Sequence, residues 1–148
     1  MVKKILPPTY FYLGLIFIVL THFFFPISKI IFFPFNLLGI ILILLGTALN
    51  LFAWSHFIKN NTTQNPHKQP SKFIQDGVYK LSRNPMYLGM LAILFGVSVL
   101  FGDLLSFLFP ILFLIIMNWF FIPLEEKNME KQFGKKYREY KNKVGRWI

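Results

Sequence analysis

Four long stretches of the 148-residue chain contain no Asp, Glu, Lys or Arg, namely 5–28, 30–58, 84–102 and 104–124. The shortest of them has 19 residues. A helix needs about 20 predominantly apolar residues to cross the hydrocarbon core of a bilayer. The composition agrees, because 55% of the residues are hydrophobic and only 15% are charged. The sequence therefore predicts an all-α integral membrane protein, a helical bundle of about four transmembrane helices.

A secretory signal peptide is the alternative explanation for the first stretch, because Lys3 and Lys4 precede an apolar run. No small-residue cleavage site follows that run, and the chain continues through the aromatic segment 21–26. We therefore expect the first stretch to be a retained transmembrane helix.

The basic residues are distributed unevenly along the chain, which has 16 Lys and Arg against 6 Asp and Glu. If the helices alternate in direction, every Lys and Arg except Lys29 lies on one side of the membrane. Positive charge marks the cytoplasmic side. We expect both termini to be cytoplasmic, and the shortness of the chain and its lack of Cys favour a prokaryotic plasma membrane. The basic face should attract anionic membrane lipids, and no nucleic-acid partner is expected.

Turn residues divide the chain into a single membrane domain over 1–148, with helices at roughly 8–25, 34–57, 85–102 and 104–123. Asn84 and Pro85 resemble an N-cap followed by proline at the first helical position. A polar cytosolic loop is expected at 58–84. A C-terminal amphipathic helix on the cytosolic face is expected at 124–144, because its apolar side chains recur at helical spacing (Met129, Phe133, Tyr137, Tyr140, Val144 and Trp147).

Two predicted helices carry glycines seven residues apart, Gly39 with Gly46 and Gly89 with Gly96. Small residues at this spacing allow close helix packing in lipid. The second pair could instead leave an opening of lipid width on helix 85–102, and the sequence leaves both interpretations open.

Ionisable residues are absent from the middle of every predicted span, and His22, His56 and Asp103 lie near predicted helix ends. Proton-coupled pumps place such groups within their spans, so that class is disfavoured. No carboxylate lies at metal-ligand spacing from any His, and the chain contains no Cys, so no metal site is predicted.

Two polar clusters, 76–89 and 123–129, remain at the predicted cytosolic helix ends. Glu125 and Glu126 are two of only six acidic residues and directly follow a predicted span. Adjacent carboxylates in so basic a surface suit a ligand with hydroxyl groups and a positive centre. Tyr79 and Tyr87 could add stacking or cation–π attraction. Alternatively, the tyrosines are interfacial anchors and the carboxylates are merely solvated.

Four short motifs in these regions resemble the isoprenylcysteine carboxyl methyltransferase and phospholipid methyltransferase superfamily. The chain reads Gly-Val-Tyr at 77–79, Arg-Asn-Pro-Met-Tyr-Leu-Gly at 83–89, Glu-Glu at 125–126, and Phe-Gly-Lys-Lys-Tyr-Arg-Glu-Tyr at 133–140. They follow the family order, with a gap the size of a helical hairpin between the second and third. The resemblance covers about 64–144.

The resemblance implies a membrane methyltransferase that uses S-adenosylmethionine, with a lipophilic methyl acceptor entering from the bilayer. It places the cofactor between the inner loop, the start of helix 85–102 and the C-terminal helix. The residues that match the family's cofactor contacts are Gln64, Lys72, Phe73, Ile74, Tyr79, Asn84, Pro85, Met86, Tyr87 and Glu125.

Two positions depart from the family pattern. Asn84 replaces a histidine, so a base that titrates near neutral pH is not available there. Phe121 stands where the prenylcysteine enzymes have an arginine linked to the substrate carboxylate.

The acceptor and the catalytic groups stay open at this point. Tyr87, Glu126 and Asn118 are the candidates for assisting the reaction. An isoprenylcysteine-like carboxylate is the first expectation for the acceptor, with a phospholipid amine as the alternative. A non-catalytic membrane scaffold or lipid-binding protein is the rival outside the enzymes.

Overall fold

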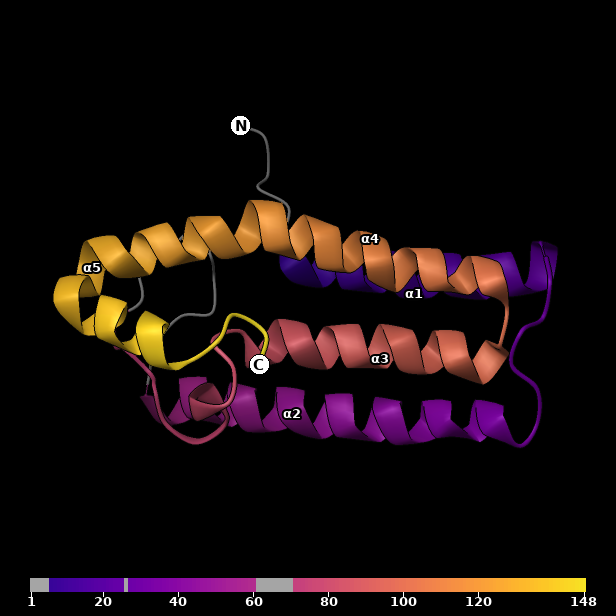
Figure 1. The fold of residues 1–148 in the computed structure, drawn as a ribbon, viewed down its shortest axis with the longest axis horizontal. Helices are drawn as coiled ribbons and strands as arrows, with labels where there is room; N and C mark the ends of the chain where they lie inside the picture. The colour runs from indigo at the N-terminus through magenta and orange to yellow at the C-terminus, as the bar shows by residue number, and fades with distance from the viewer. Residues whose placement is uncertain (1–5, 26, 61–70) are drawn as a thin grey trace.

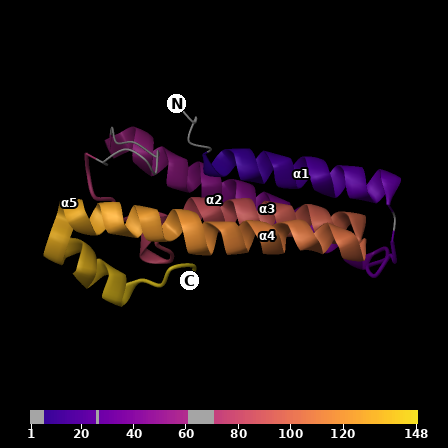
Figure 2. The same cartoon turned by 90° about the horizontal axis from the view of Figure 1, so that it is seen from above.

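The computed structural model describes residues 6–25, 27–60 and 71–148. In these residues four apolar helical segments and a polar helix are present. The four segments lie roughly antiparallel in a bundle, and the polar helix continues beyond one end (Figures 1 and 2). The elements are α1 (Pro7–Phe24), α2 (Leu38–Asn60), α3 (Pro85–Phe101), α4 (Leu108–Ile116) and α5 (Ile122–Lys143), with short 3₁₀ turns η1 (Phe35–Leu37), η2 (Gly77–Lys80) and η3 (Leu104–Phe107). The π-helix η4 (Met117–Phe121) joins α4 to α5.

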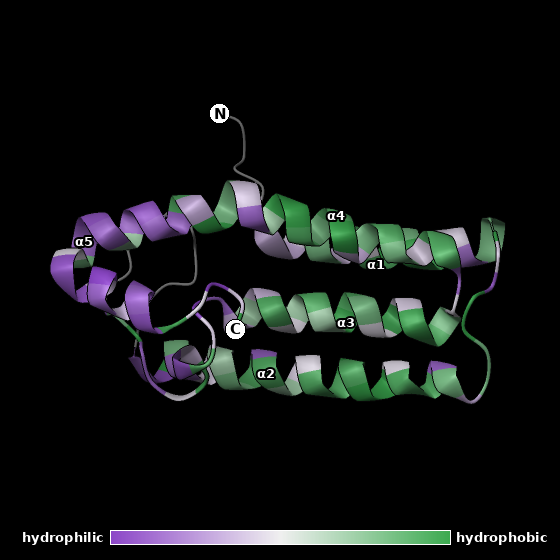
Figure 3. Ribbon diagram, in the orientation of Figure 1, coloured by the Kyte–Doolittle hydropathy of each residue, from purple (hydrophilic) through white to green (hydrophobic). Residues whose placement is uncertain are grey.

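Three helical segments of the described chain are long and apolar enough to cross a membrane: Pro7–Phe24, Phe35–Asn60 and Leu104–Lys143. The fourth, α3, is apolar but has only 17 residues, which corresponds to about 25 Å of helix. Figure 3 shows hydrophobic residues throughout the bundle and hydrophilic ones on α5. The prediction of an all-α protein with four apolar helices is confirmed, with three of them as candidate spans.

Reciprocal glycine contacts hold α2 against α3. A Cβ added to Gly39 would lie 2.3 Å from the carbonyl oxygen of Gly96, and one added to Gly46 would lie 2.6 Å from that of Gly89. In the reverse direction, a Cβ added to Gly89 or Gly96 would lie 2.7 Å from the carbonyl oxygen of Gly46 or Gly39, respectively. Backbones this close leave no room for a side chain. The glycines of α3 therefore serve helix packing, and the lipid-width opening at these positions was a wrong interpretation.

The other face of α3 packs against α1 and against the helix that begins with α4. Ile18, Leu94 and Met117 are completely buried where these helices meet, and Phe113 is 2% exposed. Large apolar side chains on the outside of the bundle remain exposed, as expected for surfaces that contact lipid.

At the end of the bundle away from α5, the two connections between helices bind each other. The amide of Ile30 donates to the carbonyl of Gly102 at 2.7 Å, and that of Leu104 donates to Ser28 at 3.1 Å. The His22 ring is hydrogen-bonded to the buried Asp103 carboxylate. These contacts explain both ionisable residues as part of a structural turn.

The fourth apolar segment continues into the polar region without a break. Pro123 follows the π-helical turn η4 and does not end the helix. The chain instead reverses at Gly134, whose φ of 51° and ψ of −122° are non-helical and suit glycine. The expected separate amphipathic helix over 124–144 is therefore not what forms. Two helical arms, 122–133 and 135–143, meet at Gly134 to form a hook.

Candidate active site at the polar end of the bundle

Tyr79 lies in η2, on the loop that leads into α3. Gly77 has a φ of +60°, and a Cβ there would lie 2.4 Å from the His56 ring, so only glycine allows the loop to pack on α2. Tyr79 is 7% exposed, and burial raises the pKa of its phenol. Tyr140 of the hook donates a 2.5 Å hydrogen bond to the Tyr79 carbonyl. The loop, α2 and the hook are thus joined at this residue.

The segment just before η2 packs against two groups of apolar side chains, the aromatic rings of the hook and the buried cluster around Tyr79. Phe73 contacts three aromatic rings of the hook, with ring centroids 5.4 Å from Phe133, 5.8 Å from Tyr137 and 5.2 Å from Tyr140. Ile74 belongs to a buried cluster with Tyr79, and Met86 packs against that cluster. Lys72 is exposed, and Gln64 lies outside the described residues.

Asn84 precedes α3 but does not cap it, because its side chain makes no capping hydrogen bond. The Asn84 amide Nδ2 instead donates to the Arg146 carbonyl at 2.8 Å. Pro85 is completely buried at the first turn. Asn84 and Pro85 thus occupy the predicted positions at the helix start, but the expected side-chain cap was wrong, because the Asn84 amide binds the C-terminal segment.

Tyr87 joins the start of α3 to α5. Its hydroxyl donates to Glu125 Oε1 at 2.5 Å, and its side chain is only 7% exposed. The charge-free part of the fourth segment ends at Leu124, so the half-buried Glu125 lies just outside it. Burial raises the pKa of Glu125 to about 7, the Glu126 charge adds to this, and the Tyr87 hydrogen bond opposes it. A cationic ligand would stabilise the ionised carboxylate.

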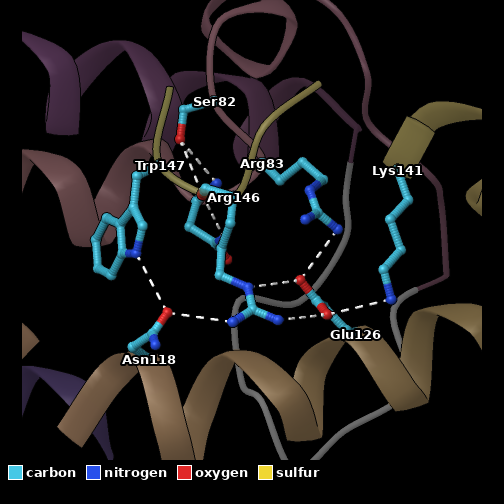
Figure 4. A network of polar contacts seen from close by, with 8 residues as sticks. Ser82, Arg83, Asn118, Glu126, Lys141, Arg146 and Trp147 are labelled. Carbon is cyan, nitrogen blue, oxygen red and sulfur yellow. Dashed lines mark hydrogen bonds and ion pairs between the residues drawn. The ribbon is translucent and has the colours of Figure 1, made fainter. Parts of the chain in front are cut away.

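Glu126 has the opposite environment, since it is surrounded by basic side chains (Figure 4). Arg146 donates from Nε to Oε1 and from Nη2 to Oε2, both at 3.1 Å. Arg83 Nη1 lies 3.0 Å from Oε1, and Lys141 Nζ lies 3.4 Å from Oε2. Although burial disfavours ionisation, the Arg146 hydrogen bonds and these three positive charges lower the pKa of Glu126. Glu126 is thus an ionised anchor and a poor proton acceptor.

Asn118 lies on η4, the π-helical turn within the fourth apolar segment. Single π-helical turns of this kind occur often at functional sites. Asn118 Oδ1 accepts hydrogen bonds from Arg146 Nη1 at 3.2 Å and Trp147 Nε1 at 3.4 Å (Figure 4). The side chain therefore binds the C-terminal segment.

The structure brings the predicted residues together in two adjoining groups. The first contains Tyr79, Tyr87 and Glu125, with Ile74 and Met86 packed near Tyr79. The second contains Asn84, Asn118 and Glu126, all of which bind Arg146. Sequence reasoning missed Arg146, because a single arginine after the last helix carries no helical periodicity or motif.

Phe121, where the resembling enzymes carry an arginine, is 8% exposed. Its ring contacts Tyr10 of α1 edge to face at a centroid distance of 5.6 Å. This position therefore belongs to the apolar core between α1 and η4.

Comparison with known proteins bears on this arrangement. The profile of the family described as phospholipid methyltransferase matches residues 34–136. The chain is 33% identical over 120 residues to the protein-S-isoprenylcysteine O-methyltransferase of Saccharomyces cerevisiae, covering 74% of this chain and 47% of the yeast protein. It is 30% identical over 135 residues to protein-S-isoprenylcysteine O-methyltransferase B of Arabidopsis thaliana, covering 80% of this chain and 64% of that protein.

A third relative, an uncharacterized protein of Haemophilus influenzae, is 43% identical over 63 residues, which are 43% of this chain and all of that protein. The chain spans about half to two thirds of the length of the two isoprenylcysteine O-methyltransferases. The profile match includes α2, α3, the π-helical turn and the Glu125–Glu126 pair. The chain therefore belongs to the phospholipid methyltransferase family of integral membrane proteins.

Proposed function

We propose that the protein is an S-adenosylmethionine-dependent methyltransferase that acts on a lipophilic acceptor at the membrane. The observation that carries this proposal is the hydrogen bond between Tyr87 and Glu125. It ties the motif at the start of α3 to the acidic pair after the fourth apolar segment, at the boundary between apolar and polar parts of the chain.

The chemistry of Glu125 fits this cofactor. Among the interactions of the described residues, Glu125 has Tyr87 as its hydrogen-bonding partner and no cation within ion-pair distance, whereas Glu126 has three. S-adenosylmethionine carries a positive sulfonium and a ribose diol. A carboxylate can accept hydrogen bonds from the diol, and a cation nearby would favour its ionised form.

When bound, the cofactor would supply an electrophilic methyl group, whose bond to sulfur breaks as the acceptor's lone pair forms the new bond. The residues contribute by holding the reactants in line, which can lower such a barrier by about 7–11 kcal/mol. Tyr87 and Glu125 would bind and orient the cofactor. Glu126 and Asn118 are committed to Arg146, so they act as positioning residues in this proposal rather than as bases.

An isoprenylcysteine-like carboxylate is our first candidate for the acceptor. A carboxylate is already nucleophilic when ionised, whereas an ammonium group must first lose a proton. In this proposal Glu125 is assigned to the cofactor and Glu126 to its basic neighbours, so neither is assigned to remove such a proton. A phospholipid amine remains the second candidate, because the matching family is described as phospholipid methyltransferase.

The test is transfer of labelled methyl from S-adenosylmethionine into lipid by membranes that contain the protein. We expect label in the organic extract, and we expect Glu125→Gln to abolish it. The matched control is Glu139→Gln, because Glu139 lies on α5, is 59% exposed and pairs only with Lys135, at 3.9 Å, among the described ion pairs.

Treatment of the labelled lipid with base separates the acceptors. Label released by base indicates a methyl ester on a carboxylate, and stable label indicates an N-methyl group. Binding of the cofactor without any transfer would support the non-catalytic lipid-binding protein instead.

A further inference from the structure

Three cationic side chains meet at one carboxylate beside the candidate active site. Arg83, Lys141 and Arg146 all lie within 3.4 Å of Glu126 oxygen atoms. One carboxylate cannot neutralise three cations, so the group has an excess of positive charge. The Glu126 side chain is only 9% exposed, which places this excess partly out of water.

Arg83 is the most buried member of the group. Its side chain is only 10% exposed, its Nη1 lies 3.0 Å from Glu126 Oε1, and its Nε has no hydrogen-bond partner among the described residues. Buried donors without acceptors are unfavourable, and those of a charged group especially so. An anion that entered this positively charged cluster would offer the acceptor that Arg83 Nε lacks.

One side of the cluster borders a cavity. Glu126 and Lys141 also line a cavity of about 500 Å³ between the two arms of the hook. Three more cations line it, Lys127, Lys131 and Arg138, with Glu130 as the second carboxylate. Lys141 and Arg146 are about one third exposed, so their outer donors remain accessible.

We infer that Arg83, Lys141 and Arg146 form a binding site for an anionic oxygen group, a carboxylate or phosphate, of a reactant. The inference rests on the proposed function and adds a chemical requirement to it. Charge-assisted hydrogen bonds to carboxylate or phosphate are among the strongest in proteins, and arginine can supply two at once. Glu126 directly follows Glu125 in the sequence. An anion bound beside Glu126 would therefore hold a reactant near Glu125, the residue proposed to bind the cofactor.

The anion could belong to the carboxylate of S-adenosylmethionine or to the polar end of the acceptor. Three matched pairs of probes separate these sources: S-adenosylmethionine and its decarboxylated form; N-acetyl-S-farnesylcysteine and its methyl ester; and dioleoyl phosphatidic acid and dioleoylglycerol. Binding of each is measured with the full chain in an uncharged detergent. Trp147 serves as the fluorescent reporter after Trp54→Phe and Trp119→Phe, because its indole binds the same Asn118 as Arg146.

The variants are Arg146→Gln and Lys141→Gln, with Lys135→Gln as the matched control, since Lys135 is on the same helix and 87% exposed. In at least one pair, the Kd of the anionic member should rise about tenfold or more in Arg146→Gln while that of its neutral partner changes less than twofold. Lys141→Gln should act in the same direction, and its partly exposed position makes misfolding a minor concern.

The pair that responds identifies the source of the anion. Equal changes for the anionic and neutral members of all three pairs would overturn the inference, as would an equally large effect of Lys135→Gln. The proposed function fails separately, if the unmodified protein does not bind S-adenosylmethionine at all.

Discussion

Replacing Gly46 with alanine tests whether the site depends on the close approach of α2 and α3. The added Cβ would lie 2.6 Å from the Gly89 carbonyl oxygen and 2.9 Å from Ile93 Cγ1. The first of these atoms is backbone and cannot rotate away, so the two helices must separate by several tenths of an ångström. Inserting a carbon into a packed interior costs about 1–3 kcal/mol.

Alanine also improves helix propensity by about 1 kcal/mol, which offsets part of this cost. The matched control is Gly14→Ala in α1, because its Cβ would meet only Leu94 methyl carbons, at 3.1 and 3.6 Å. A side-chain end can shift, so the control should keep most of the propensity gain. We therefore expect Gly46→Ala to be less stable than Gly14→Ala by about 2 kcal/mol.

The assay is reversible unfolding of both variants in mixed micelles, followed by helical circular dichroism, with S-adenosylmethionine affinity measured on the same preparations. Gly46→Ala should also weaken cofactor binding, since α3 carries Tyr87 toward Glu125. If Gly46→Ala proved as stable as Gly14→Ala, the glycine contacts would not be the determinant of this packing.

Four further predictions concern titration and buried hydrogen bonds. The pKa of Glu125 is raised to about 7, and a sulfonium favours the ionised form of this carboxylate. S-adenosylmethionine should therefore bind more tightly as pH rises from 5.5 to 7.5, by up to about tenfold per pH unit below 7. Calorimetry should show no such pH dependence for Glu125→Gln. The same raised pKa makes the stability of the ligand-free fold depend on pH. The contribution of the Glu125 carboxyl is fully present below the pKa of this group in the unfolded chain and is lost as pH rises through 7. The free energy of unfolding measured at several pH values tests this. Tyr140→Phe removes the hydrogen bond to the Tyr79 carbonyl and should lower the unfolding free energy by about 1–3 kcal/mol, whereas retention of full stability would argue against that bond. Asp103→Asn leaves His22 without its carboxylate and should destabilise the far end of the bundle while leaving cofactor affinity within twofold.

The distribution of charge was enough to predict the four apolar helices, because a membrane span has no other way to satisfy its backbone. It also placed the polar ends of α3 and of the fourth segment together, and the contact of Tyr87 with Glu125 agrees with that placement. The glycine spacing on α2 indicated packing, whereas the same spacing on α3 was ambiguous until its partner glycines were known.

The contacts made by irregular segments could not be predicted from the sequence. Asn84 has the residue type of a cap, yet its amide binds the Arg146 carbonyl, since the C-terminal segment folds back over the start of α3. The hook was missed for a related reason. The apolar spacing on both sides of Gly134 fits one helix equally well, and only the backbone angles of Gly134 show that the chain reverses.

The central claim is that the polar end of this bundle binds S-adenosylmethionine through Glu125. Its most direct test is equilibrium binding of S-adenosylmethionine to the intact protein in detergent, which requires no knowledge of the acceptor. We expect saturable binding that Glu125→Gln weakens about tenfold or more and Glu139→Gln leaves unchanged. Absence of binding by the intact protein, or equal affinity in the two variants, would contradict the account.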